Sequence, residues 1–297
     1  MNLAPFRFDY LPVNDRPKIT WPNNARVALW VAPNIEHYEY TPLSRPKQPD
    51  IPHYVRNDYG NRVGFWRMMD ILNKYGVRGC TCLNLGVLDH FPEVRQAMID
   101  ADWRYMAHGV YNTRPLYGYS IEKERAYWAD FIATVKKYTG KQVKGRLGGG
   151  GGYTENTDDL MAEAGCTYHT SWIIDDQPCP IKVKGGQRFI YVPYSGQTND
   201  VIIQMADRET DFFCQQVKDQ FDTLYREGAD SGRVMCISLH PQMIGRPNSA
   251  KYLDEMLKYI LGHDAVWLTT ADEIADYYLE HCYDEYMNYV AERAKKA

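Results

Sequence analysis

The chain has 297 residues, a length that suits a single α/β barrel. Its formal net charge is −4, and neither lysine nor arginine gathers into a stripe that would neutralise many phosphates, which argues against a nucleic-acid partner. The N-terminus MNLAPFRFDY lacks the basic start and apolar core of a secretory signal, and no segment approaches about 18 consecutive apolar residues. We therefore expect a cytoplasmic protein without a membrane partner.

Short apolar, β-branched runs alternate with longer stretches of helical periodicity along the chain. In chain order we expect a strand at 26–33, a helix at 64–76, a strand at 77–85, a helix at 92–101, a strand at 103–109, a helix at 121–139, a strand at 141–147, a helix at 156–165, a strand at 188–193, a helix at 211–227, a strand at 233–240, a helix at 250–261, a strand at 265–270 and a last helix from 271. Gly76 and Gly140 are expected helix stops, and Thr270 with Glu273 predicts a capping box.

Repeated strand-then-helix units imply parallel strands joined by helical crossovers. We predict an α/β fold of the distorted (β/α) barrel type with seven or eight strands. No low-complexity linker divides the chain, so we expect one domain over 1–297, with an N-terminal extension at 1–20 and a C-terminal helical extension at 283–297. The aromatic-rich segment at the C-terminus is expected to pack on a neighbouring subunit in a homodimer or homotetramer.

The seven cysteines are scattered, and several stand in apolar runs such as VMCISL. We interpret them as reduced packing residues. Cys80 and Cys82 would point to one face of an alternating strand, so a zinc or redox pair is an alternative. Structural zinc takes four ligands, however, and no second pair matches these two.

Polar residues follow the ends of the predicted strands, where a barrel collects its chemistry. Glu36 and His37 follow the first strand, His108 and Asn112 the third, and His240 the strand at 233–240. The intervening loops add Arg146, the glycine run at 148–152 with Gly150 at its centre, Trp172, Asp175, Asp176, Tyr194, Thr198, Asn199 and Asp200. Imidazoles and carboxylates thus reach one rim, as in a hydrolase.

Each candidate also has a structural interpretation. A lone carboxylate such as Glu36 often caps a helix or lies on the surface, and a histidine after an apolar strand is often a hydrogen-bonded core group. The glycine run is either a flexible loop or a way for backbone amides to approach a bound oxygen, and it lacks the Gly-Lys-Ser ending of a phosphate loop. Asp175 and Asp176 are candidates for capping a turn before Pro178.

The chain resembles the polysaccharide deacetylase superfamily in the order of four segments: Asn34-Ile-Glu36, Ala-His108-Gly, the Tyr194 to Asp200 loop, and Ser238-Leu-His240 followed by Ile244-Gly-Arg246-Pro. The resemblance covers about residues 20–280 and is closest to the branch of PuuE-type allantoinases and cyclic imide hydrolases. It implies a distorted barrel of the NodB-like type and hydrolysis of a non-peptide C–N amide bond.

The chain departs from the metal-binding pattern of that superfamily. Metal-dependent members carry an Asp-Asp pair and a His-x-x-x-His pair, whereas this chain has Glu36-His37 and His108 followed by Asn112. Neutral asparagine is a poor zinc ligand, and the allantoinase branch that the chain resembles also lacks the full set, which implies a reaction without a metal. We therefore expect no cofactor and a substrate-binding role for Asn112. If zinc or another divalent metal is present, Glu36, His37 and His108 are its expected ligands.

A metal-free hydrolysis needs a base for the water, a donor for the oxyanion and an acid for the leaving nitrogen. We assign Glu36 as the base, with its pKa raised toward neutrality by burial, and His240 as the acid. His108, Asn112, Arg146 or the amides of 148–152 are candidates for the oxyanion. Substrate contacts are expected from His37, Asn112, Arg146, Gly150, Trp172, Asp175, Tyr194, Thr198 and Asn199.

The proline-rich insert at 41–60 is expected to fold over the rim after Glu36 and to close a small pocket. We therefore predict ring opening of a small cyclic amide, imide or ureide, with allantoin, hydantoins and succinimide-like imides as first compounds to test. One alternative is a metal-dependent N-deacetylase of an acetylated sugar. The other is a catalytically silent barrel that binds a sugar or metabolite, to which the 24 tyrosines would be suited.

Overall fold

The computed structural model describes residues 7–42, 48–148, 152–205 and 208–296. The strands are β1 (Val27–Ile35), β2 (Cys80–Leu83), β3 (Arg104–Ala107), β4 (Gly145–Arg146), β5 (Tyr168–His169), β6 (Cys179–Pro180), β7 (Ile190–Tyr191), β8 (Arg233–Leu239) and β9 (Val266–Thr269). The helices are α1 (Ile51–Tyr59), α2 (Phe65–Lys74), α3 (Gly86–His90), α4 (Pro92–Asp100), α5 (Ile121–Thr139), α6 (Thr157–Glu163), α7 (Val201–Met205), α8 (Thr210–Glu227), α9 (Ala250–Leu261), α10 (Ala271–His281) and α11 (Tyr283–Lys296). Two short helical turns are η1 (Pro22–Asn24) and the π-helical η2 (Gly60–Gly64).

The strands form one curled sheet in the order β6-β7-β5-β4-β3-β2-β1-β8, and β9 also pairs with β1. Every pairing between these strands is parallel except that of β6 with β7. The predicted distorted barrel of parallel strands is confirmed. The described residues hold nine strands, and the antiparallel β6 brings the number above the predicted seven or eight.

Irregular backbone takes the place of a strand next to β8. The amide of Ser238 donates to the Thr198 carbonyl (2.9 Å), and the amide of Asp200 donates to the Ser238 carbonyl (3.1 Å). Asn199 and Ser238 form an isolated parallel bridge between these hydrogen bonds. The loop after β7 is thereby held against the end of β8.

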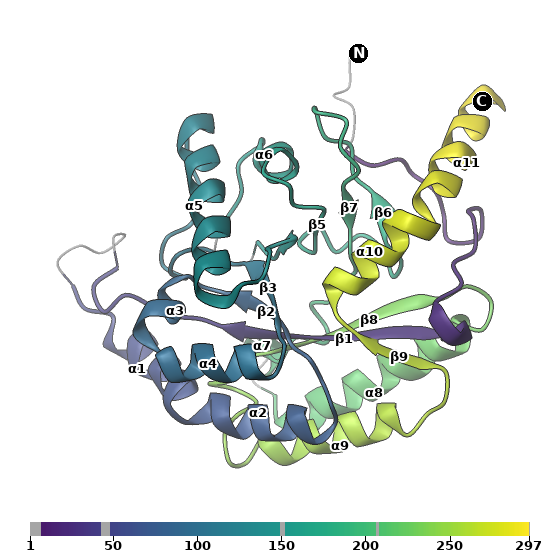
Figure 1. The fold of residues 1–297 in the computed structure, drawn as a ribbon. Coiled ribbons are helices and arrows are strands. Elements are labelled where there is room, and N and C mark those ends of the chain that lie inside the picture. Colours follow the sequence, from purple (N-terminus) through teal and green to yellow (C-terminus); the bar gives the residue numbers. More distant parts are fainter. Residues whose placement is uncertain (1–6, 43–47, 149–151, 206–207, 297) are drawn as a thin grey trace.

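Side chains of β1 alternate between two apolar clusters, as the period of a strand requires. Val27, Leu29 and Val31 belong to the cluster that also contains residues of the surrounding helices, whereas Ala28 and Trp30 belong to the cluster inside the sheet. All nine positions of β1 are buried, as expected for a central parallel strand covered on both faces. Figure 1 shows α2, α8 and α9 along the outer side of β1 and β8.

The cysteines are free, and all but the partly buried Cys282 are buried, as predicted. Cys80 and Cys82 both lie in the inner cluster, which confirms that their side chains share one face of β2. Burial raises the pKa of the Cys82 thiol well above its usual value, so this thiol remains protonated. Both cysteines pack as small apolar residues.

Most predicted elements are present with small shifts of their ends. Gly76 and Gly140 end α2 and α5 with positive φ, and the hydroxyl of Thr270 accepts a hydrogen bond from the Glu273 amide. The Glu273 carboxylate binds Arg78 and Thr269, so only half of the capping box forms. The strands expected at 141–147 and 188–193 are only two residues long each. The sequence pattern did not predict five short elements: β5, β6, α1, α3 and α7.

The C-terminal helix α11 packs on its own chain. Tyr286 is buried, and Tyr289 and Arg293 contact the carboxylate of Asp15 in the N-terminal segment. The apolar residues that motivated the predicted dimer or tetramer thus have an intramolecular partner, and the oligomeric state stays a prediction. Within the described ranges, no helix is both long and apolar enough to cross a membrane.

Candidate active site

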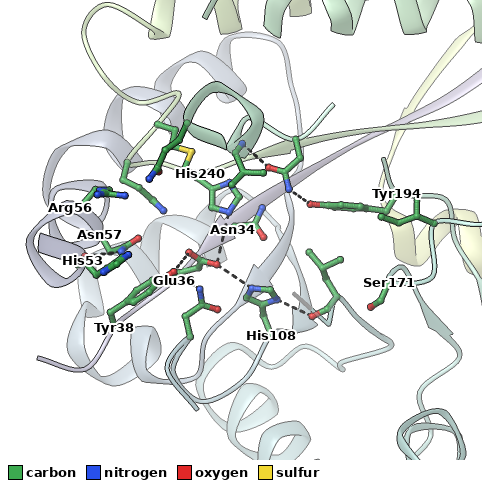
Figure 2. A pocket seen from close by; sticks show the side chains of 18 of the residues that line it. Asn34, Glu36, Tyr38, His53, Arg56, Asn57, His108, Ser171, Tyr194 and His240 are labelled. Atoms are coloured by element: carbon green, nitrogen blue, oxygen red, sulfur yellow. Dashed lines mark hydrogen bonds and ion pairs between the residues drawn. The ribbon is translucent and has the colours of Figure 1, made fainter. Parts of the chain in front are cut away.

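A cavity of about 470 Å³ lies at the C-terminal ends of the parallel strands. Glu36 follows β1, His108 follows β3 and His240 follows β8, and all three line this cavity. Figure 2 shows Glu36 between the two histidines, with His53, Arg56 and Asn57 at one end of the cavity and Ser171 and Tyr194 at the other. The volume is typical of a small-molecule site.

The Glu36 carboxylate contacts both imidazoles through one oxygen. Glu36 Oε1 lies 3.2 Å from Nε2 of His108 and 3.9 Å from Nε2 of His240. The exposed fractions of Glu36, His108 and His240 are 6%, 2% and 8%, so the three groups meet in a region largely closed to water. The predicted catalytic residues are therefore brought together.

The hydrogen-bond partners of His108 indicate which of its two ring nitrogens carry a proton. Nδ1 lies 2.9 Å from the Leu147 carbonyl oxygen, which can only accept, so Nδ1 carries a proton. Nε2 faces the Glu36 carboxylate, which also accepts unless it is protonated. The close contact thus requires a further proton, either on Nε2 or on the carboxyl group.

Asp200 orients His240. Its Oδ2 accepts a hydrogen bond from the His240 amide and its Oδ1 one from His240 Nδ1, both at 2.7 Å. Nδ1 is therefore the protonated nitrogen, and Nε2 is turned toward Glu36. Burial lowers the pKa of His240, but the charge and hydrogen bond of Asp200 and the charge of Glu36 raise it by more, so the net shift is upward.

The pKa of Glu36 shifts in the direction opposite to our expectation. Burial raises the pKa of this carboxyl, but the hydrogen bond from His108 and the charges of His240 and His108 lower it by more. The net pKa lies below its usual value, so Glu36 is ionised at neutral pH. The expected rise toward neutrality was wrong because the histidine neighbours lower the pKa by more than burial raises it.

Tyr38 links Asn112 to Glu36. The amide Nδ2 of Asn112 donates to the Tyr38 hydroxyl, which in turn donates to Glu36 Oε2 over 3.4 Å. This direction leaves the Oδ1 of Asn112 as a buried acceptor without a partner in the described part of the chain. Asn112 is also one of the residues that line the cavity.

Tyr194 and Asn199 form the opposite wall. The Tyr194 hydroxyl donates to Ser238 Oγ (2.6 Å) and accepts from Asn199 Nδ2 (2.7 Å). Asn34 also donates to Ser238 Oγ, at 2.8 Å. These hydrogen bonds hold both predicted residues in the cavity wall.

Several residues that were predicted to contact the substrate lie outside the cavity lining. The Thr198 hydroxyl donates to the Cys236 carbonyl at 2.6 Å and is fully buried, and Arg146 is buried against the ring of Tyr153, 4.5 Å from its centroid. Trp172 packs on Phe8 and His169, and Asp175 binds Arg16 at 2.7 Å. The structure therefore does not support substrate contacts from Thr198, Arg146, Trp172 and Asp175, nor an oxyanion role for Arg146. Gly150 lies outside the described residues.

His37 is part of an aromatic cluster and does not line the cavity. Its ring centroid lies 4.8 Å from that of His90 and 5.0 Å from that of Phe91. Burial and the charge of His90 lower its pKa to about 4, so the imidazole is neutral at pH 7. The backbone carbonyl of His37 accepts from the Asn112 amide at 3.0 Å, which gives this residue a structural role.

The residues present do not fit the metal set considered above. His37 is turned into the aromatic cluster and does not line the cavity with Glu36 and His108. Across the described ranges, no group of three or more histidine, cysteine, aspartate or glutamate side chains is arranged to hold a metal ion. The conditional ligand set of Glu36, His37 and His108 is not brought together.

Close backbone packing positions the loop that carries His240. A Cβ on Gly64 would lie 2.0 Å from the carbonyl oxygen of Pro241, so only glycine allows η2 to approach this closely. A Cβ on Gly245 would lie 2.4 Å from the same oxygen. The π-helical turn between α1 and α2 thus packs directly on the residues after His240.

The local sequence pattern did not predict the contribution of α1. His53, Arg56 and Asn57 line the cavity, which agrees with the expected folding of the 41–60 insert over the rim. Tyr38 and the partner role of Asp200 were also missed. Asp200 was noted in its loop, but only its hydrogen bonds to His240 identify what it does.

Comparisons with known proteins show where this architecture recurs. No family model matches the chain. A Schizosaccharomyces pombe protein with the provisional name polysaccharide deacetylase is 26% identical over 301 residues, which cover 89% of this chain and 92% of that protein. The crystal structure of Puue Allantoinase has a TM-score of 0.83 and 24% identity, over 95% of this chain and 100% of that chain. A Pseudomonas aeruginosa PAO1 structure, also provisionally a polysaccharide deacetylase, has a TM-score of 0.80 and 26% identity, over 90% and 96% of the two chains.

Proposed function

We propose that this chain, which belongs to the polysaccharide deacetylase superfamily, is a hydrolase of non-peptide C–N bonds that opens a small cyclic amide, imide or ureide. The observation that carries the proposal is the contact of one Glu36 oxygen with two imidazoles in a cavity of about 470 Å³. Such a site offers a base and an acid to a small molecule that is largely withdrawn from water.

Glu36 is the base in this proposal. Its lowered pKa keeps the carboxylate ionised at neutral pH. Oε1 is shared by the two imidazoles, whereas Oε2 has only the long 3.4 Å hydrogen bond from Tyr38. We therefore assign Oε2 to the attacking water, from which it removes a proton as the oxygen adds to the substrate carbonyl.

His240 is the acid. Its raised pKa favours the imidazolium near neutral pH, and Asp200 holds Nδ1 so that the Nε2 proton faces the cavity. That proton passes to the ring nitrogen when the C–N bond breaks. The products are an open-chain carboxylate and a free amide, urea or amine nitrogen. His108 stays hydrogen-bonded to Glu36 and stabilises its charge.

Asn112 supports a substrate that carries an N–H group. Its Oδ1 is a buried acceptor in the cavity wall without a partner in the described residues, and such groups are normally satisfied when the site is filled. Imides and ureides present N–H beside the reacting carbonyl. Their nitrogen is also a better leaving group than that of a simple acetamide, so the reaction needs less help from a Lewis acid. We accordingly propose a reaction without a metal.

An N-deacetylase of acetylated sugars is the second candidate. The provisional names of the Schizosaccharomyces pombe and Pseudomonas aeruginosa relatives favour it, and an N-acetyl group also offers an N–H to Asn112. A polymer needs an open groove, however, and here α1 contributes His53, Arg56 and Asn57 to the cavity wall. A cavity wall formed by α1 favours a small cyclic substrate over a polymer.

The test is a turnover panel of allantoin, hydantoin, dihydrouracil and succinimide beside N-acetylated chito-oligosaccharides. Ring opening is followed by the loss of ultraviolet absorbance and by mass, and deacetylation by released acetate. We expect at least one ring to be opened and no acetate to be formed. Acetate release with every ring intact would establish the deacetylase instead.

A further inference from the structure

Arg56 on α1 is a charged side chain in the cavity wall that the proposed reaction does not use. It is half-buried, and among the described residues its guanidinium has no carboxylate within ion-pair distance. The neighbouring acidic groups of this helix have other partners: Asp50 binds His53 at 3.0 Å, and Asp58 binds Arg62. Arg56 is thus a cation in the cavity wall whose donors have no hydrogen-bond partner within the described part of the chain.

A second cavity continues from the first past Arg56. It has a volume of about 340 Å³, and the two cavities share Arg56, Gln204, Gln242 and Met243 as wall residues. The shared region therefore combines one guanidinium with two side-chain amides, all of which can donate hydrogen bonds. Figure 2 places Arg56 at the α1 end of the first cavity, with Glu36 and His240 between it and Tyr194.

The other charged groups around the second cavity limit what can bind there. Arg246 donates its Nε to the Gln242 carbonyl at 2.8 Å and stacks on Tyr59, 5.1 Å from the ring centroid. Glu209 also lines this cavity and is exposed. Arg246 keeps its positive charge, because neither a carbonyl nor an aromatic ring neutralises a guanidinium. Arg56, Arg246 and Glu209 together therefore give this cavity a net charge of about +1, which matches a singly charged anion better than a doubly charged one.

We propose that the substrate is a cyclic amide, imide or ureide that carries a carboxylate on a short arm, and that Arg56 binds this carboxylate. The inference rests on the proposed ring opening and adds the substrate class. A planar guanidinium matches a carboxylate with two parallel hydrogen bonds. A phosphate monoester carries up to two negative charges and fits the charge balance less well. The arm reaches from the ring at Glu36 toward α1.

Two hydantoins of nearly equal shape test the charge requirement: 5-(carboxymethyl)hydantoin and its neutral amide, 5-(carbamoylmethyl)hydantoin. We expect the wild-type kcat/KM to be about tenfold or more higher for the acid. Arg56→Gln should lower the value for the acid by about 10- to 100-fold and leave that for the amide within about twofold, the scale of hydrogen bonds to charged groups. Arg56→Lys should retain part of the preference for the acid, because lysine keeps the positive charge but lacks the planar guanidinium that makes two parallel hydrogen bonds.

Arg62→Gln is the matched control. Arg62 belongs to the same helical run, its side chain is 73% exposed, and it lines neither cavity. This variant should keep the wild-type preference, and melting temperatures of all variants report on folding. Equal use of acid and amide by the wild type, or an equal loss on both compounds in Arg56→Gln, would overturn the carboxylate site while leaving ring opening intact.

A separate experiment covers the case in which neither hydantoin is opened. Calorimetric titration of the wild type and Arg56→Gln with the acid then measures binding alone. Tighter binding by the wild type would support the carboxylate site although the proposed reaction fails. Equal binding, or none, would overturn the site as well.

Discussion

Replacement of Asp200 by asparagine tests whether this residue controls His240. The carboxylate is fully buried and accepts two hydrogen bonds from His240, from the amide and from Nδ1, both at 2.7 Å. Asparagine has the same shape but only one acceptor oxygen. Whichever way its amide is turned, one N–H of His240 must face an NH₂ group.

The structure sets the expected size of the effect. Losing one hydrogen bond to a buried charged acceptor costs about 1.5–3 kcal/mol, so we expect the free energy of unfolding of Asp200→Asn to fall by about 2–3 kcal/mol. Asp200 is also the largest of the influences that raise the pKa of His240. Without it the pKa of His240 falls and less imidazolium is present at neutral pH, so kcat should fall by up to about 100-fold, the scale of general acid catalysis.

The assay is kcat/KM against pH for a ring that the wild type opens. His240 acts as an acid, so activity is lost as pH rises through its pKa, and the raised pKa keeps the wild type active to higher pH. In Asp200→Asn this loss should begin at lower pH. Asp272→Asn is the control, because Asp272 is buried and accepts from Tyr168 at 2.7 Å but does not line the cavity. An unchanged pH profile and near-normal kcat in Asp200→Asn would refute the reasoning.

The remaining predictions concern the base, the metal and the loop after β8. Glu36→Gln and His108→Ala should each lower kcat by about a hundredfold or more with the fold retained by circular dichroism, and near-normal turnover in either variant would show that the site is misplaced. Activity should survive exhaustive chelation, whereas full loss with EDTA that zinc or cobalt restores at one equivalent per subunit would reject the metal-free reaction. Gly64→Ala should lower the free energy of unfolding by about 1–3 kcal/mol and reduce kcat, because the new Cβ overlaps the Pro241 carbonyl oxygen at 2.0 Å. Gly196→Ala, whose Cβ would meet open space, should do neither.

Local patterns predicted the fold well where one segment carries its own signal. The apolar run at 26–33 predicted the buried strand β1, and the helix stops at Gly76 and Gly140 depend only on adjacent backbone. The two-residue strands β4, β5, β6 and β7 were lost or overextended. These strands are defined by hydrogen bonds to neighbouring strands, and the hydrophobic periodicity of a single segment does not predict such bonds.

The sequence by itself determined which residues follow the strand ends, and therefore that Glu36, His108 and His240 belong to one rim. Only the tertiary structure decided what each does there. Glu36 and His108 are 72 positions apart, and their contact lowers a pKa that burial alone would raise. Asp200 reaches His240 because the loop after β7 binds β8, and Arg56 lines the cavity from a helix that leads into the turn where Gly64 packs against Pro241. Contacts between distant segments, and the balance of burial against charge that follows from them, arise from the curl of the sheet and are absent from any local pattern.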